Sequence, residues 1–254
     1  MRLTFLLVVS VFLSGFSALG QVQQVVIGSA ASGATTIAPD SLASIYGQNF
    51  TTQAQQAKTL PFPTSLADIS VRVTDVAGTA SLASLVYASP TQINFVVPAG
   101  VAAGAATVQV ISGANVVAQG TVQVLSTAPA LFTVDSSGVA AAYAVRTIAP
   151  SGPQTVIPAF DCSQGACSTV TLNLGVDTPL YLELFGTGIR GSMNVTATVG
   201  GQTVPVTYSG AQGQYPGLDQ VNMGLTLNLR GAGKVPVVVT VDGQKSNAVF
   251  IEIQ

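Results

Sequence analysis

Histidine and tryptophan are absent from the sequence, and charged residues are scarce. Only 7% of the 254 residues are Asp, Glu, Lys or Arg, whereas about 25% is usual for a soluble domain. Without histidine the chain has no imidazole base, no histidine metal ligand and no Ser-His-Asp or Cys-His catalytic arrangement. Eight basic residues and a net charge of −2 argue against a nucleic-acid interface, which needs a cationic surface.

The first twenty residues have the pattern of a secretory signal peptide. Arg2 precedes an apolar run at 3–12, and Ala18 and Gly20 are small residues at the −3 and −1 positions of a cleavage site. The alternative is an uncleaved anchor helix, but the run is shorter than the roughly 20 residues that span a bilayer. We therefore expect residues 1–20 to be removed after Gly20. The mature chain is then secreted, and it has no later apolar segment long enough to span a membrane.

Cysteine occurs only twice, as Cys162 and Cys167 in the run DCSQGACS. Because the chain is predicted to be exported to an oxidising compartment, we expect these residues to form a disulfide. A thiol redox site and half of a metal site are the alternatives. A zinc site would need two further Cys or His ligands, and the sequence has none. We accordingly expect no metal site.

Apolar and polar residues alternate in short runs, and no stretch after the signal peptide sustains a helical period. Clear alternation occurs at 69–73, 195–199, 237–241 and 249–253. Between such runs, Gly200-Gly201 and Asp242-Gly243 are typical of tight hairpin turns, because glycine accepts a positive φ. Short strands separated by such turns predict an all-β fold built from antiparallel sandwiches.

The chain also repeats itself. SLASIYGQNF at 41–50 aligns with LYLELFGTGI at 180–189, and PTQINF at 90–95 aligns with LDQVNM at 218–223. The first copy has a longer loop, TTQAQQAKTLPFPT, at 51–64. Such a repeat predicts two structural units of the same kind.

We predict a seam near residue 126 and two tandem immunoglobulin-like sandwiches, at 37–126 and 127–254. An N-terminal segment at 21–36 precedes them, and the second sandwich contains the predicted disulfide. Each unit has about the size of an independently folding sandwich domain.

The repeated motifs resemble a known family. They are TSLADISVRV, LVYASPTQINFVVP, TAPALFT, YLELFGTGIRG and PGLDQVNMGLTLNLRGAGKVPVVVTVDGQKSNAV. These segments look like the Solibacter-type C-terminal domain family of secreted acidobacterial proteins, and the resemblance runs from about residue 37 to 254. The resemblance implies a region that often follows other extracellular domains, has no established activity and supplies no catalytic residues. Each half also resembles the IPT/TIG type of immunoglobulin-like fold.

The run FGTGIRG contains G-x-G-x-x-G at Gly186, Gly188 and Gly191. A dinucleotide site would need a helix next and an acidic residue about 20 positions later. Instead the next residues alternate as a strand, and the first acidic residue is Asp219. We interpret the three glycines as turn residues and expect no cofactor.

Two Gln-x-Asn pairs recur in the repeat, Gln92/Asn94 and Gln220/Asn222. At a spacing of two, both amides of a pair project from the same face of a strand. They could form a polar binding surface, but we favour hydrogen bonds to neighbouring loop backbone. Asp219, beside Gly217, is expected to open a strand and is interpreted as a turn or bulge residue.

A second candidate for binding is the loop TYSGAQGQYPG, at 207–217. Its possible ligand-binding residues are Tyr208, Gln212, Gln214 and Tyr215. Exposed aromatic rings beside amides can stack on sugars, and loops at the end of a sandwich are frequent binding sites. The alternative is that both rings pack the loop onto the sheet. Segments 51–64 and 209–218 are the first loops in which to seek a ligand.

Taken together, these features predict a secreted, non-enzymatic structural or adhesive module at the cell surface or in the extracellular matrix. Other surface proteins or extracellular polysaccharide are the expected partners, and low charge favours self-association. The alternative is a carbohydrate-binding module. A hydrolase using two carboxylates is a third hypothesis, and it requires both groups in one cleft.

Overall fold

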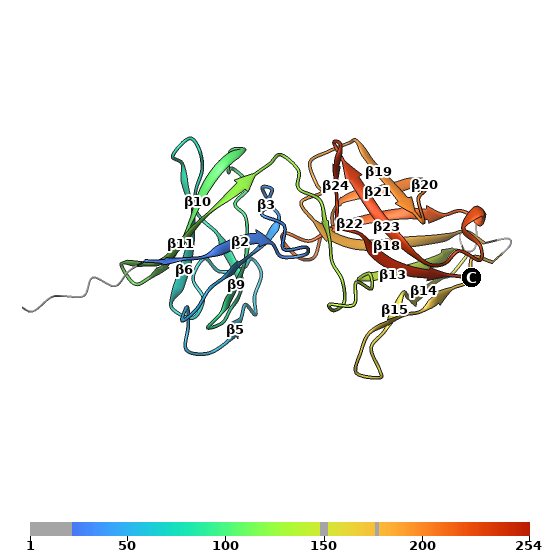
Figure 1. The fold of residues 1–254 in the computed structure, drawn as a ribbon, viewed down its shortest axis with the longest axis horizontal. Coiled ribbons are helices and arrows are strands. Elements are labelled where there is room, and N and C mark those ends of the chain that lie inside the picture. Colours follow the sequence, from blue (N-terminus) through green and yellow to red (C-terminus); the bar gives the residue numbers. More distant parts are fainter. Residues whose placement is uncertain (1–21, 148–151, 176–177) are drawn as a thin grey trace, which may run out of the picture.

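The computed structural model describes residues 22–147, 152–175 and 178–254. Within these ranges the regular elements are β-strands and a single 3-10 turn, η1 (Leu227–Leu229) (Figure 1). The predicted all-β class is therefore confirmed. The predicted signal peptide lies outside the described residues. In the described ranges no helix has both the length and the apolar character to cross a membrane.

The strands before residue 125 form two sheets. The first has the order β1-β11-β10-β6-β7, with β3 also paired to β11. Its strands are β1 (Gln23–Gln24), β3 (Thr36–Ile37), β6 (Ile69–Thr74), β7 (Ala80–Leu82), β10 (Gly104–Ser112) and β11 (Asn115–Val124). The second sheet has the order β2-β4-β9-β8-β5. Its strands are β2 (Val26–Ser29), β4 (Leu42–Tyr46), β5 (Gln55–Gln56), β8 (Ser84–Ala88) and β9 (Gln92–Val96).

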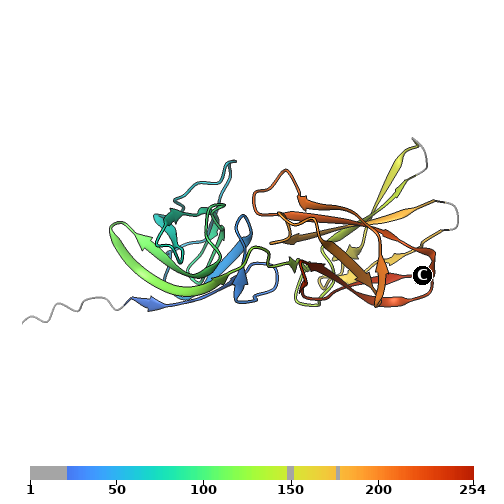
Figure 2. The same ribbon diagram turned by 90° about the horizontal axis from the view of Figure 1, so that it is seen from above.

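The later strands form two more large sheets, on the other side of the molecule (Figures 1 and 2). The third sheet has the order β14-β13-β18-β22-β21, with β12 paired to β18. Its strands are β12 (Ala130–Leu131), β13 (Ala142–Thr147), β14 (Gln154–Pro158), β18 (Leu180–Thr187), β21 (Val206–Ala211) and β22 (Asp219–Leu225). The fourth has the order β17-β25-β23-β19-β20, with β24 paired to β23. Its strands are β17 (Thr171–Leu172), β19 (Val195–Val199), β20 (Gln202–Val204), β23 (Gly233–Val241), β24 (Gln244–Lys245) and β25 (Val249–Ile253).

The strand pairing follows the repeat in the sequence. Ile45 of β4 pairs with Ile93 of β9, and Leu184 of β18 pairs with Val221 of β22. The repeat aligns these same two pairs. The strand orders also correspond, since β4-β9-β8 in the second sheet matches β18-β22-β21 in the third. The number of domains and their boundary near residue 126 stay predictions.

Buried apolar side chains form two separate clusters. One takes Ile45 and Phe95 from the second sheet and Val108 from the first. The other takes Leu184 from the third sheet and Val237 from the fourth. Each cluster thus lies between two sheets, as in a sandwich, and burying one such side chain contributes about 1.5–3 kcal/mol.

The turns match most of the glycine predictions. Gly200-Gly201 joins β19 to β20 and Asp242-Gly243 joins β23 to β24, all with positive φ, so both hairpin predictions are confirmed. Gly188 and Gly191 also have positive φ, and the next element is a strand. Gly186 instead lies within β18, so its interpretation as a turn residue was wrong.

Cys162 and Cys167 form the predicted disulfide. It closes the tip of a small hairpin, β15 (Phe160–Asp161) and β16 (Ser168–Thr169). The backbone N–H of Cys167 donates to the Asp135 carboxylate at 3.1 Å. The disulfide therefore stabilises a peripheral hairpin and adds nothing to either core cluster.

We expect the double substitution Cys162→Ser and Cys167→Ser to lower the free energy of unfolding by about 2 kcal/mol, because the short loop is no longer constrained in the unfolded chain. Urea denaturation of both proteins measures this difference. Reductant should lower the stability of the wild type and leave the variant unchanged. Equal stability of the two oxidised proteins would contradict the prediction.

Asp75 connects two loops at one end of the first sheet. One carboxylate oxygen accepts from the backbone N–H groups of Ala77 and Thr79, both at 2.9 Å, and the other accepts from Ala102 at 3.1 Å. The bond from Ala102, followed by that from Thr79, lowers the pKa of the Asp75 carboxyl, and burial opposes this shift. The ionised form is therefore favoured by folding.

Because the pKa of Asp75 is lower in the folded than in the unfolded chain, its contribution to stability is present above the unfolded pKa of about 4. This contribution is lost as the pH falls through the folded pKa. We expect Asp75→Asn to be less stable than wild type at pH 7 and to lose less stability on acidification. Urea midpoints at pH 7 and pH 3 test this, and an equal pH dependence in both proteins would refute it.

Candidate functional site

Some of the four predicted ligand-loop residues brace the loop through hydrogen bonds to its backbone. The Tyr208 hydroxyl donates to the carbonyl oxygen of Ala211. The side-chain oxygen of Gln212 accepts from the backbone N–H of Gln214 at 3.0 Å and of Tyr215 at 3.3 Å. The Tyr208 and Tyr215 side chains are 43% and 56% exposed. The Gln212 oxygen therefore holds the loop in shape, while the two rings remain accessible.

The far end of this loop contacts the second sheet. Gly217 has a φ of +85°, and a Cβ there would lie 2.7 Å from Cγ of Leu42 and 3.3 Å from Cγ2 of Val96. Only glycine combines this backbone conformation with so close an approach. The loop is therefore a contact between the two halves of the chain.

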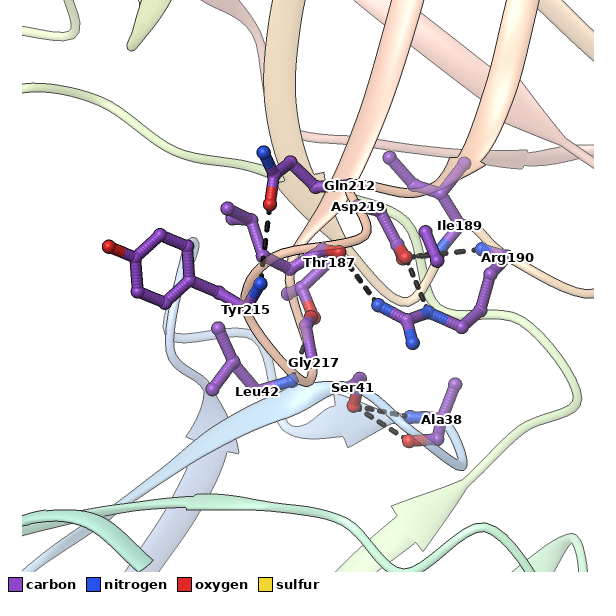
Figure 3. Close-up of polar contacts among 12 residues, drawn as sticks. Ala38, Ser41, Leu42, Thr187, Ile189, Arg190, Gln212, Tyr215, Gly217 and Asp219 are labelled. Atoms are coloured by element: carbon purple, nitrogen blue, oxygen red, sulfur yellow. Dashed lines mark hydrogen bonds and ion pairs between the residues drawn. The ribbon is translucent and has the colours of Figure 1, made fainter. Parts of the chain in front are cut away.

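A buried threonine hydroxyl joins the same two halves (Figure 3). The backbone N–H of Leu42 donates to Oγ1 of Thr187 at 2.7 Å, and Oγ1 donates to the Gly217 carbonyl oxygen at 2.7 Å. Thr187 is 1% exposed. The bond to Gly217 is buried and the bond from Leu42 is partly buried, so losing the hydroxyl leaves backbone groups without their protein partner. We call Leu42, Thr187 and Gly217 the junction triad.

An ion pair holds the base of the loop. Oδ2 of Asp219 accepts from the backbone N–H of Ile189 at 2.8 Å, and Oδ1 accepts from Nε of Arg190 at 2.5 Å (Figure 3). The Arg190 guanidinium also donates to the Leu218 carbonyl oxygen at 2.7 Å. Asp219 is fully buried at the start of β22. The expectation that it opens a strand is confirmed, and its interpretation as a turn or bulge residue was wrong, because it pairs regularly with Gly186 and Ala211.

Burial raises the pKa of the Asp219 carboxyl, and the bond from Ile189 and the charge of Arg190 oppose that shift. A buried carboxylate is tolerated here because the backbone N–H groups of Ile189 and Arg190 and Nε of Arg190 all donate to its oxygens. The pair therefore holds the start of β22 against the turn that follows β18.

The linker between the halves is bonded at both ends. The N–H of Leu125 donates to the Ile37 carbonyl oxygen at 2.9 Å, and the N–H of Ala128 donates to the Gly188 carbonyl oxygen at 2.9 Å. A Cβ on Gly188 would collide with the Ala128 carbonyl oxygen. Only residues 126 and 127 separate these two attachments, which leaves the linker little freedom.

The two Gln-x-Asn pairs each form an internal bond. Nε2 of Gln92 donates to Oδ1 of Asn94, and Nε2 of Gln220 donates to Oδ1 of Asn222, both at 2.8 Å. The predicted projection from a common face is confirmed. The predicted bonds to loop backbone were wrong, because on a strand the partner amide two positions away is closer.

The second predicted loop, 51–64, contains the short edge strand β5, which pairs with β8. A shallow pocket beside it is lined by polar residues that include Gln53, Gln55 and Asp68. Across the described ranges, no three Cys, His, Asp or Glu side chains lie close enough together to hold a metal ion.

No family model and no curated protein matches this chain.

The junction triad was not found by sequence reasoning, because its donors and acceptors are mainly backbone groups from segments 145 residues apart. The only local signal was Gly217 after Pro216, at the end of the loop 207–217.

We expect Thr187→Val to lower the free energy of unfolding by about 1–3 kcal/mol, because it keeps the side-chain shape and leaves the Leu42 N–H and the Gly217 carbonyl unpaired. Thr203→Val on the exposed edge strand β20 is the matched control and should change stability by less than about 0.5 kcal/mol. If urea denaturation shows equal effects of the two substitutions, the junction triad does not contribute to stability as predicted.

Proposed function

We propose that the chain is a secreted, non-enzymatic structural or adhesive module whose two halves act as one stiff unit at the cell surface or in the extracellular matrix. The observation that carries this proposal is the buried junction triad. A hydroxyl bonded to both halves, together with a linker attached at each end, supports a fixed arrangement of the two sandwiches.

The charge distribution supports the same role. The carboxylates of Asp75, Asp135, Asp161 and Asp219 each accept backbone N–H bonds that hold loops in place. With few remaining charges, copies of the chain repel one another weakly, which suits a protein embedded in a matrix. The resemblance to a family of secreted proteins and the disulfide also support an extracellular location.

Co-sedimentation tests the proposal. The purified chain is centrifuged alone, with washed cells of the organism that secretes it, and with the matrix extracted from those cells. We expect it to pellet with cells or matrix, or to pellet alone as large assemblies. A chain that stays soluble and monomeric in all three tubes would overturn the proposal.

Thr187→Val provides a test of stiffness in the same assay. Weakening the triad should reduce the fraction retained by cells or matrix, since the spacing between binding surfaces is no longer fixed. Thr203→Val should be retained as well as the wild type. Equal retention of all three proteins would show that adhesion does not depend on the junction.

A further inference from the structure

The outer face of the third sheet has a row of side chains that the proposed function does not use. Tyr208 pairs with Asn222, Asn222 with Glu183, and Glu183 with Tyr143, across strands β21, β22, β18 and β13 (Figure 1). Directly paired residues project from the same face of a sheet. The neighbouring Leu184 of β18 is in the core, so the row faces outward. We call these four residues the tyrosine–amide row.

A glycine makes room for the Tyr208 ring on this face. A Cβ on Gly210 would lie 3.1 Å from the Tyr208 hydroxyl oxygen. Gly210 pairs with Gln220, which lies two positions before Asn222 on β22. The Tyr208 ring can therefore lie along the sheet instead of standing away from it.

Other aromatic rings hold Tyr143 in position. Its ring centroid lies 6.2 Å from that of Phe160 and 6.0 Å from that of Phe185, the second in an edge-to-face arrangement. Tyr143 is nevertheless 36% exposed. The row therefore has an accessible, pre-positioned ring at each end, Tyr143 and Tyr208.

Polar groups lie between these rings. Gln220 donates to Oδ1 of Asn222, which orients the Asn222 amide. Glu183 has no hydrogen-bond or ion-pair partner among the residues that the structure describes. Strands β18, β21 and β22 contain no basic residue, and Arg146 of β13 donates to the carbonyl oxygens of Leu174 and Thr178. The row thus offers amide and carboxylate groups to hydroxyls and has no cation for an anionic ligand.

The first half of the chain has an equivalent row of paired residues, and there part of the row is covered. There Tyr87 pairs with Asn94, Asn94 with Ser44, and Ser44 with Gly28. The Ser44 hydroxyl is buried and donates to Asn94 at 2.9 Å, and the Ala34 carbonyl oxygen would lie 2.8 Å from a Cβ on Gly28. Serine and glycine thus occupy the positions of Glu183 and Tyr143, and part of the row is covered.

We propose that the tyrosine–amide row binds a strand of neutral polysaccharide. The two rings stack on sugar faces, and Asn222 and Glu183 bond to the hydroxyls between them. Three strand spacings separate Tyr143 from Tyr208, about 14 Å in all, which is longer than a single sugar ring. The site goes beyond the proposed stiff module. It lies on a sheet face, and Tyr208 is the residue that it shares with the ligand loop predicted from the sequence.

Sedimentation with insoluble cellulose, chitin and starch tests this inference, with soluble polygalacturonate as an anionic competitor. We expect the wild type to pellet with at least one neutral polysaccharide. Tyr143→Ala and Tyr208→Ala should each weaken that binding at least tenfold, and polygalacturonate should not compete. Tyr87→Ala, the equivalent change in the first half, is the matched control and should bind like the wild type.

Tyr143 is packed against other rings, so Glu183→Gln serves as a second variant that preserves shape. It should weaken binding at least threefold while the midpoint of thermal unfolding stays unchanged. No binding to any neutral polysaccharide, undiminished binding by both Glu183→Gln and Tyr208→Ala, or an equal loss in Tyr87→Ala would overturn the site. A chain that pellets with cells yet binds none of these polysaccharides would keep the proposed function and lose this inference.

Discussion

The hydroxyl of Thr187 is the contact on which the arrangement of the two halves depends. It accepts a bond from the backbone of β4 and donates one to the loop before β22. Neither apolar cluster includes Thr187, and the two clusters are separate. Its role is to fix one half against the other. Gly217 allows the close approach, and the ion pair of Asp219 with Arg190 holds the loop that supplies the acceptor.

The two halves of the chain share a framework of strand pairings and differ in the residues on one outer face. The two halves keep the same strand pairings and the same Gln–Asn bond. They differ on their outer faces, where Glu183 and Tyr143 replace Ser44 and Gly28 at equivalent pairing positions. A shared framework therefore supports the fold, and the open face of one half is the surface that we propose for a ligand. The junction and the face share β18 but use different residues of it, Thr187 and Glu183, so each can be altered by its own substitution.

Much of the fold could be predicted because strand alternation, glycine turns and an internal repeat are local patterns. The disulfide could be predicted because Cys162 and Cys167 have no other partner in the chain. Asp219 was correctly expected to open a strand. Its burial was missed, because an acid beside a glycine suggests a turn and the donors that bury it lie about 30 residues away. The junction could not be predicted, since it uses backbone groups that any sequence has. Cross-strand neighbours such as Tyr143 and Glu183 require the register, which alternation alone does not set.

Distance measurement between the halves tests the central claim most directly. Spin labels at Ala77→Cys and Thr203→Cys, both exposed positions on opposite sides of the junction, would report the spread of their separation by double electron–electron resonance. The account predicts one narrow distribution in the otherwise wild-type chain and a broader one when Thr187→Val is added. A broad distribution in the otherwise wild-type chain would show that the halves move independently and would contradict the account.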